Sequence, residues 1–267
     1  MYPSSVALVW DDELAALNDL TGEVQVFGRD GKFHRTLETT PPLRSIARLS
    51  SGPEGDLYAI DWFGGKLCRV NRDGRLEVVG SGGVFDGAAR VDFTADGKLL
   101  VQQDDRDAIV LVDKQGKELG AIVGGRGKNM FRWPRTFAVT PARDVLVVDW
   151  HGGNVFCYGP DLKFKGMIDQ SKVEDRFRAR WGVSAVRADR QGNVFLLSRE
   201  GSGIQKFGPD GSYIMTILLD EAEHGTFARP EDLVLDADGT IYAADTGNNR
   251  VLKFIPTRPA PKGVPGR

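Results

Sequence analysis

The sequence has little of several features that mark large classes of protein. It contains no apolar run near the roughly 20 residues that a membrane-spanning helix needs. Its formal net charge of −2 argues against a general polyanion-binding protein. Two cysteines cannot build a disulfide scaffold, and three histidines leave little material for a His-based metal centre. No signal-peptide pattern opens the sequence, so the cytoplasm is the favoured location.

The two cysteines, Cys68 and Cys157, are expected to be reduced thiols in the core. Glycine, by contrast, is abundant at 33 of 267 residues, which indicates many tight turns. A polar residue also ends an apolar strand six times along the chain, at Asn18, Asp61, Gln103, Asp149, Ser198 and Asp245. Successive members are 43, 42, 46, 49 and 47 residues apart. This spacing is typical of propeller blades, whose repeats are about 40–50 residues long.

The repeats predict an all-β fold, a six-bladed β-propeller of four-stranded antiparallel blades. The second strands of the repeats are nearly continuous apolar runs, as expected for strands buried on both faces. The propeller should occupy residues 1–255, and residues 256–267 read as a Pro-rich flexible tail. Because this tail cannot pair as a regular strand, the last blade should lack its outer strand and leave Arg250–Phe254 as an open edge. Such an edge can accept a strand from a partner.

The sixth repeat resembles an NHL repeat. The resemblance rests on Phe227-x-x-Pro230, Asp236-x-Asp-Gly239, Ile241 to Asp245, and Asn249-Arg250-Val251. It extends over the whole chain in degraded form, but the Asp–Arg pair of this motif is complete only in the sixth repeat. The resemblance implies a six-bladed propeller. It implies little about chemistry, because the NHL family includes RNA binders, protein-interaction modules and lyases.

Aromatic and arginine residues gather in the loops of one side of the predicted ring. This side, the loop face, contains the loops that precede each inner strand and the turns between second and third strands. Repeats two and four share the string Asp-Trp-x-Gly-Gly there. Exposed Trp beside Arg is typical of recognition surfaces, whereas the alternative is that these rings pack between blades. The candidate binding residues are Trp62, Phe63, Trp150, His151, Arg132, Trp133, Arg135, Arg178, Arg180, Trp181 and Arg229.

The polar residues that end the second strands are candidate metal ligands. Asn18, Asp61, Asp149 and Asp245 would form an axial Ca²⁺ site if their oxygens converged. The favoured alternative is that each accepts hydrogen bonds from the backbone of the following turn.

Three functions remain open at the level of sequence. The first is a non-enzymatic scaffold that binds a protein or peptide on the loop face. The second is a metal-assisted lyase or hydrolase at the axis, centred on His151 and the aspartates. A three-histidine zinc site is disfavoured because His34 lies on the opposite side from His151 and His224. The third is a single-stranded RNA binder that uses Arg and aromatic side chains.

Overall fold

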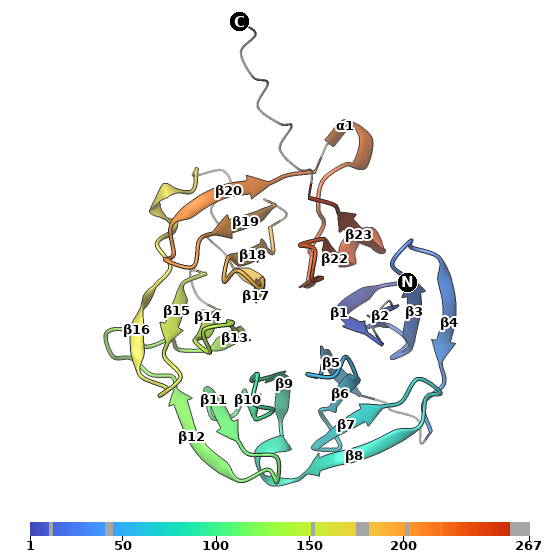
Figure 1. Cartoon of the computed structure of the whole chain (residues 1–267), viewed down its shortest axis with the longest axis horizontal. Coiled ribbons are helices and arrows are strands. Elements are labelled where there is room, and N and C mark those ends of the chain that lie inside the picture. Colours follow the sequence, from blue (N-terminus) through green and yellow to red (C-terminus); the bar gives the residue numbers. More distant parts are fainter. Residues whose placement is uncertain are drawn as a thin grey trace, which may run out of the picture.

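Six antiparallel sheets surround a common axis (Figure 1). The computed structural model describes residues 1–10, 13–40, 45–150, 153–174, 182–200, 203–219 and 221–256. In every sheet the strands follow one another in sequence order, and the first strand lies next to the axis. Five blades have four strands and the last has three, which confirms the predicted propeller with an incomplete sixth blade.

The described residues form 23 strands, which are distributed as follows. Blade 1 consists of β1 (Pro3–Val9), β2 (Glu13–Asn18), β3 (Val24–Gly28) and β4 (Phe33–Leu37). Blade 2 consists of β5 (Ile46–Ser51), β6 (Leu57–Asp61), β7 (Lys66–Val70) and β8 (Leu76–Ser81). Blade 3 consists of β9 (Ala88–Phe93), β10 (Leu99–Gln103), β11 (Ala108–Val112) and β12 (Glu118–Val123). Blade 4 consists of β13 (Pro134–Val139), β14 (Val145–Asp149), β15 (Val155–Tyr158) and β16 (Phe164–Met167). Blade 5 consists of β17 (Val183–Ala188), β18 (Val194–Ser198), β19 (Ile204–Phe207) and β20 (Tyr213–Ile217). Blade 6 consists of β21 (Asp232–Leu235), β22 (Ile241–Asp245) and β23 (Arg250–Phe254).

In the described residues, helical structure is confined to short segments. One α-helical turn, α1 (Glu221–His224), precedes blade 6. The 3₁₀ turns are η1 (Gly83–Phe85), η2 (Gln170–Lys172) and η3 (Thr246–Asn248). No helix in the described ranges is long and apolar enough to cross a membrane.

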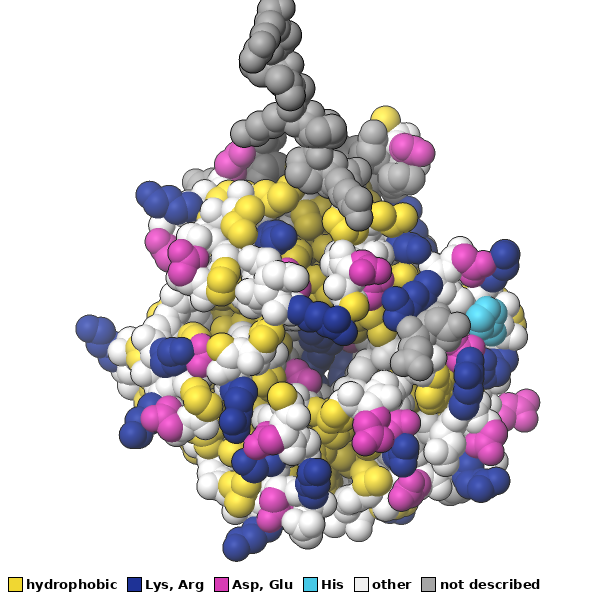
Figure 2. Space-filling model, in the orientation of Figure 1, with side chains coloured by type: hydrophobic (Ala, Val, Ile, Leu, Met, Phe, Trp, Pro, Cys, Tyr) yellow, Lys and Arg dark blue, Asp and Glu magenta, His cyan; other side chains and the backbone are white. Residues whose placement is uncertain are grey.

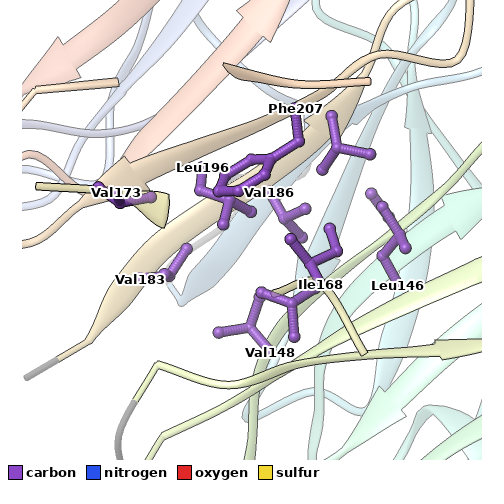
Figure 3. Packing of buried hydrophobic residues seen from close by; sticks show 11 residues of the cluster. Leu146, Val148, Ile168, Val173, Val183, Val186, Leu196 and Phe207 are labelled. Carbon is purple, nitrogen blue, oxygen red and sulfur yellow. The ribbon is translucent and has the colours of Figure 1, made fainter. Parts of the chain in front are cut away.

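The hydrophobic core is divided among the six interfaces between neighbouring blades. Each cluster of buried side chains joins the facing sheets of two adjacent blades. Figure 3 shows the cluster between blades 4 and 5, where Leu146 and Val148 of β14 face Val186 of β17 and Leu196 of β18. Every second strand therefore meets apolar neighbours on both sides, which explains its lack of period-two polarity.

Blade 6 closes the ring against blade 1 through side chains. Among the described residues, their shared cluster has six buried hydrophobic side chains, fewer than the eight to eleven at the other interfaces. Hydrogen bonds supplement it. Thr246 Oγ1 donates to the Pro3 carbonyl oxygen at 2.6 Å, and Lys253 Nζ donates to the Arg29 carbonyl oxygen at 2.7 Å. Closure by packing between the first and last blades thus confirms the prediction from the sequence.

Strand β23 should show the amide exchange of an open edge. Among the described residues it pairs only with β22, whereas β3 pairs with both β2 and β4. Alternate amides of an antiparallel edge strand face away from their neighbour. We expect alternate amides of Arg250–Phe254 to exchange rapidly in the isolated protein while those of Val24–Gly28 are protected throughout. Uniform protection of β23 in a monomer would show that another segment covers this edge.

The two cysteines are free thiols, as predicted. Cys68 is buried in β7, and Cys157 is partly buried in β15. Burial raises the pKa of both thiols, with a smaller contribution from nearby carboxylates. Because the thiolate is the reactive form, a raised pKa makes both residues poor nucleophiles near neutral pH.

Candidate functional site

A cavity of about 450 Å³ opens where blades 2, 3 and 4 meet near the axis. We call it the axial cavity. Its volume lies within the range of roughly 300–1,000 Å³ that is usual for ligand sites. Its lining residues are Ala47, Arg48, Trp62, Ala89, Arg90, Gln102, Asp104, Asp107, Trp133, Pro134, Arg135 and Trp150.

Three tryptophans from different loops surround this cavity. Trp62 follows β6, Trp133 precedes β13 and Trp150 follows β14, and their residues are 45%, 47% and 45% exposed. Backbone hydrogen bonds fix the loops: Trp62 N–H donates to the Ser45 carbonyl oxygen at 3.0 Å, and Trp150 N–H donates to that of Trp133 at 2.8 Å. Each tryptophan is thus about half exposed, and all three line the same cavity.

The other candidate binding residues lie outside this lining. Phe63 is 82% exposed and packs on Trp62, with ring centroids 5.0 Å apart. Arg132 and Arg229 are exposed on loops before β13 and β21. The remaining candidates, His151, Arg178, Arg180 and Trp181, lie outside the described residues.

In one layer of charged side chains at the axis, the carboxylate of Glu231 lies close to three guanidinium groups. Glu231 Oε2 accepts a hydrogen bond from Arg135 Nη2 at 2.8 Å. Arg48 Nη2 lies 3.8 Å from the same oxygen, and Arg199 Nη2 lies 3.7 Å from Glu231 Oε1. The Arg135 guanidinium also lies over the Trp150 ring, 4.4 Å from its centroid, in a cation–π contact. Burial lowers the pKa of Arg135 to about 10, although Glu231 opposes this effect.

A second layer of charged side chains is centred on Asp232, which is fully buried. Its Oδ1 lies 2.8 Å from Arg187 Nη2 and 3.9 Å from Arg90 Nη2. Its Oδ2 accepts hydrogen bonds from Ser5 Oγ at 2.9 Å and Val6 N–H at 3.2 Å. Burial alone would raise the pKa of Asp232, but attraction by Arg187 and Arg90 outweighs it and lowers that pKa.

These two layers form what we call the axial network. Its members are Arg48, Arg90, Arg135, Arg187, Arg199, Glu231 and Asp232. Figure 2 shows a hollow at the centre of the ring with Lys and Arg side chains beside it. Arg90 lines both the axial cavity and a second cavity of about 210 Å³ that is formed by inner strands of all six blades. The axis is therefore lined by charged side chains, with more arginines than carboxylates in this network.

The sequence carries a signal for three members of this network, Arg48, Arg90 and Asp232. The residue thirteen positions before each strand-ending polar residue is itself polar in five of the six repeats. The residues there are Ser5, Arg48, Arg90, Thr136 and Asp232, with Ala185 in the fifth repeat. A polar residue at one register position of otherwise apolar inner strands indicates side chains that face the axis rather than a neighbouring sheet.

The strand-ending polar residues serve the backbone of their own blades. Asn18 Oδ1 accepts from Tyr2 N–H at 3.1 Å and Leu20 N–H at 3.3 Å, and Asp61 Oδ1 accepts from Gly64 N–H at 3.0 Å. Like Tyr2, the donors in blades 4 and 6 precede the inner strands: Trp133 N–H donates to Asp149 Oδ1 at 3.2 Å, and Ala228 N–H donates to Asp245 Oδ1 at 2.7 Å.

These bonds agree with the backbone-bonding interpretation and extend it from the following turn to the preceding loop. The Asp–Arg pair of the sixth repeat is also formed, with Arg250 Nε 2.8 Å from Asp245 Oδ2. In the described part of the chain, no three His, Cys, Asp or Glu side chains lie close enough together to share a metal ion. The candidate axial Ca²⁺ site gains no support from this arrangement, since arginines are the main charged groups at the axis.

Comparison with known proteins supports the architecture. Residues 227–254 match the family model of the NHL repeat. The chain is thus a six-bladed β-propeller with an NHL repeat in its last blade. No curated protein matches the sequence.

Several solved structures share the fold. A virginiamycin B lyase from Staphylococcus aureus aligns with a TM-score of 0.62 at 11% identity, over 96% of this chain and 85% of that one. A gluconolactonase from Xanthomonas campestris aligns with a TM-score of 0.65 at 14% identity, over 91% and 82%. A Bacteroides thetaiotaomicron protein of unknown function aligns with a TM-score of 0.70 at 15% identity, over 94% and 68%. Identities this low show a common fold and carry no activity from one protein to another.

Proposed function

We propose that the protein is a non-enzymatic recognition module that binds a protein or peptide segment on its loop face. The observation that carries this proposal is the ring of three half-exposed tryptophans around an arginine-lined cavity. Trp and Arg are the residues most enriched among binding hot spots, because they combine large contact area with hydrogen bonding. Hydrogen bonds tie these loops to one another and to the side chain of Asp149 at the end of β14, so the surface is preorganised and less entropy is lost on binding.

Binding is favoured over catalysis by the composition of the cavity. Among the described residues no histidine lines it, and its arginines are engaged with carboxylates or aromatic rings. An acyl- or phosphoryl-transfer site needs a nucleophile within reach of a base, or a metal. The lyase and the gluconolactonase that share the fold support the propeller but not a reaction at this cavity.

Selection of random peptides displayed on phage tests this function. The wild-type protein should enrich convergent sequences, and Trp62→Ala or Trp150→Ala should weaken the selected peptide by at least about 30-fold, the equivalent of about 2 kcal/mol at a hot spot. Leu20→Ala is the matched control, since Leu20 is an exposed apolar residue of the blade 1 turn, outside the cavity lining. Affinities would be measured by isothermal titration calorimetry.

Two further measurements distinguish peptide recognition from the metal-assisted enzyme and from the RNA binder. Loss of binding in EDTA would indicate a metal-dependent site. Binding of a fluorescent single-stranded RNA 12-mer with a steep salt dependence would instead indicate a nucleic-acid binder. If no sequence converges, or if both tryptophan variants bind as tightly as the wild type, the loop face is not a peptide-binding surface.

A further inference from the structure

Two residues that line the axial cavity each have a buried polar atom without a hydrogen-bond partner. Within the described part of the chain, neither Arg90 Nε nor Gln102 Oε1 has one. The Arg90 side chain is 6% exposed, and Gln102 is 3% exposed. Both residues line the cavity. Unpaired buried groups are costly, so an unpaired donor and an unpaired acceptor on two lining residues favour a ligand that supplies one group of each kind.

The partners of these residues explain why they are fixed in place. Arg90 Nη1 donates to Thr136 Oγ1 at 3.1 Å, which leaves its Nε–H free. Gln102 Nε2 donates to the Pro134 carbonyl oxygen and to Asp104 Oδ1, both at 2.9 Å, which leaves its Oε1 free. The two side chains are thus held by neighbouring groups while one atom of each stays unpaired.

The charges of the axial network favour an anion at this place. Five arginines share two carboxylates, Glu231 and Asp232. Burial and repulsion by Arg187 lower the pKa of Arg90 to about 9, so its charged form is under-compensated. A carboxylate that entered the cavity would add the acceptor that Arg90 lacks, and charge-assisted hydrogen bonds of this kind are strong.

We propose that the axial cavity binds a carboxylate group of the recognised peptide, with Arg48, Arg90 and Arg135 as the basic wall. Gln102 Oε1 then accepts a hydrogen bond from a backbone N–H next to that carboxylate. The inference rests on the proposed function and adds the chemistry of the ligand. The carboxylate comes either from an Asp or Glu side chain or from the C-terminus of the peptide.

The carboxylates in the cavity lining argue against a polyanion. Asp104 and Asp107 line the same cavity as the arginines, and Asp105, between them in sequence, is exposed. Burial raises the pKa of Asp104 and Asp107, which shows that their charges are also poorly compensated. A nucleic acid would bring a phosphate with every nucleotide to this rim. A single carboxylate flanked by N–H donors suits this lining, because the carboxylate pairs with the arginines and the N–H groups can donate to the aspartates.

Three matched heptapeptide libraries test the inference by fluorescence polarisation. The first has a central Glu and an amidated C-terminus, the second has Gln instead with the same amide, and the third has Gln with a free C-terminal carboxylate. We expect the first or the third library to bind at least about tenfold more tightly than the second, as a charge-assisted hydrogen bond requires. Which of the two binds identifies the source of the carboxylate.

Variants of the basic wall provide the second readout. Arg48→Gln and Arg90→Gln should bring the three libraries to within about twofold of one another, because the carboxylate then lacks its charged partners. Arg126→Gln, an exposed arginine of the loop before β13, is the matched control and should keep the preference. Arg48 is more exposed than Arg90, so its variant remains informative if Arg90→Gln fails to fold.

The outcomes separate this inference from the proposed function. Equal, Trp62-dependent binding of all three libraries would overturn the carboxylate site and leave peptide recognition standing. Binding of none of them would overturn both. Tight binding of a single-stranded RNA 12-mer in place of the peptides would overturn both in favour of nucleic acid.

Discussion

Replacing Asp232 by asparagine should lower the free energy of unfolding by about 3–5 kcal/mol, the usual cost of removing one partner from a buried ion pair. Asp232 is the only carboxylate that the described residues place beside both Arg187 and Arg90. Without its charge, two buried guanidinium groups lose compensation. The side chain also bonds Ser5 Oγ and Val6 N–H, so the substitution weakens the junction of blade 6 with blade 1.

This loss should be visible in both thermal and chemical unfolding. For a domain of this size, 3–5 kcal/mol corresponds to a fall in Tm of roughly 6–20 °C. Asp238→Asn removes the same charge from an exposed turn of the same blade and should change stability by no more than about 0.5 kcal/mol. If Asp232→Asn costs less than about 1 kcal/mol, the axial network does not support closure of the ring.

The number and order of the blades could be predicted because each blade is a local unit. Its strands are consecutive in sequence, so one repeated polar position was enough to set the register of all six repeats. The missing outer strand followed from the prolines after Phe254. Strand starts are harder to locate from sequence: Glu13 directly follows Asp11 and Asp12, yet it is a buried residue of β2. Its ion pairs override the preference of a glutamate for solvent.

The candidate site could be predicted only in part, because some of its residues lie in local loops and others meet only across distant blades. Trp62, Trp133 and Trp150 stand in loops whose side of the ring follows from strand order alone. The axial network joins blades that are distant in sequence, since Arg90 and Asp232 belong to blades 3 and 6. No local pattern specifies which charges of six inner strands will meet at the axis. The geometry of the ring decides that, and it appears only when all blades are placed.

A second charged cluster, on the rim between blades 1 and 2, should make stability depend on pH. The Glu13 carboxylate accepts hydrogen bonds from Arg35 Nη1 at 2.6 Å and Arg35 Nη2 at 2.9 Å. His34 Nδ1 lies 2.9 Å from it, and Arg72 Nε of blade 2 lies 3.2 Å from Oε2. The hydrogen bonds from Arg35 outweigh the effect of burial and lower the pKa of Glu13 from 4.5 to about 2.

Because the pKa of Glu13 is lower in the folded state, its charged form stabilises the fold. This contribution is about 3 kcal/mol at 1.4 kcal/mol per pH unit. It is fully present above pH 4.5 and is lost as the pH falls towards 2. We therefore expect Glu13→Gln to be less stable than the wild type by about this amount at pH 7, with a difference that shrinks steadily below pH 4.5. Urea unfolding from pH 7 to pH 3 measures it, with Glu23→Gln, an exposed carboxylate of the same blade, as the control. A difference that stays constant over this range would show that packing around Glu13, rather than its charge, stabilises the junction of blades 1 and 2.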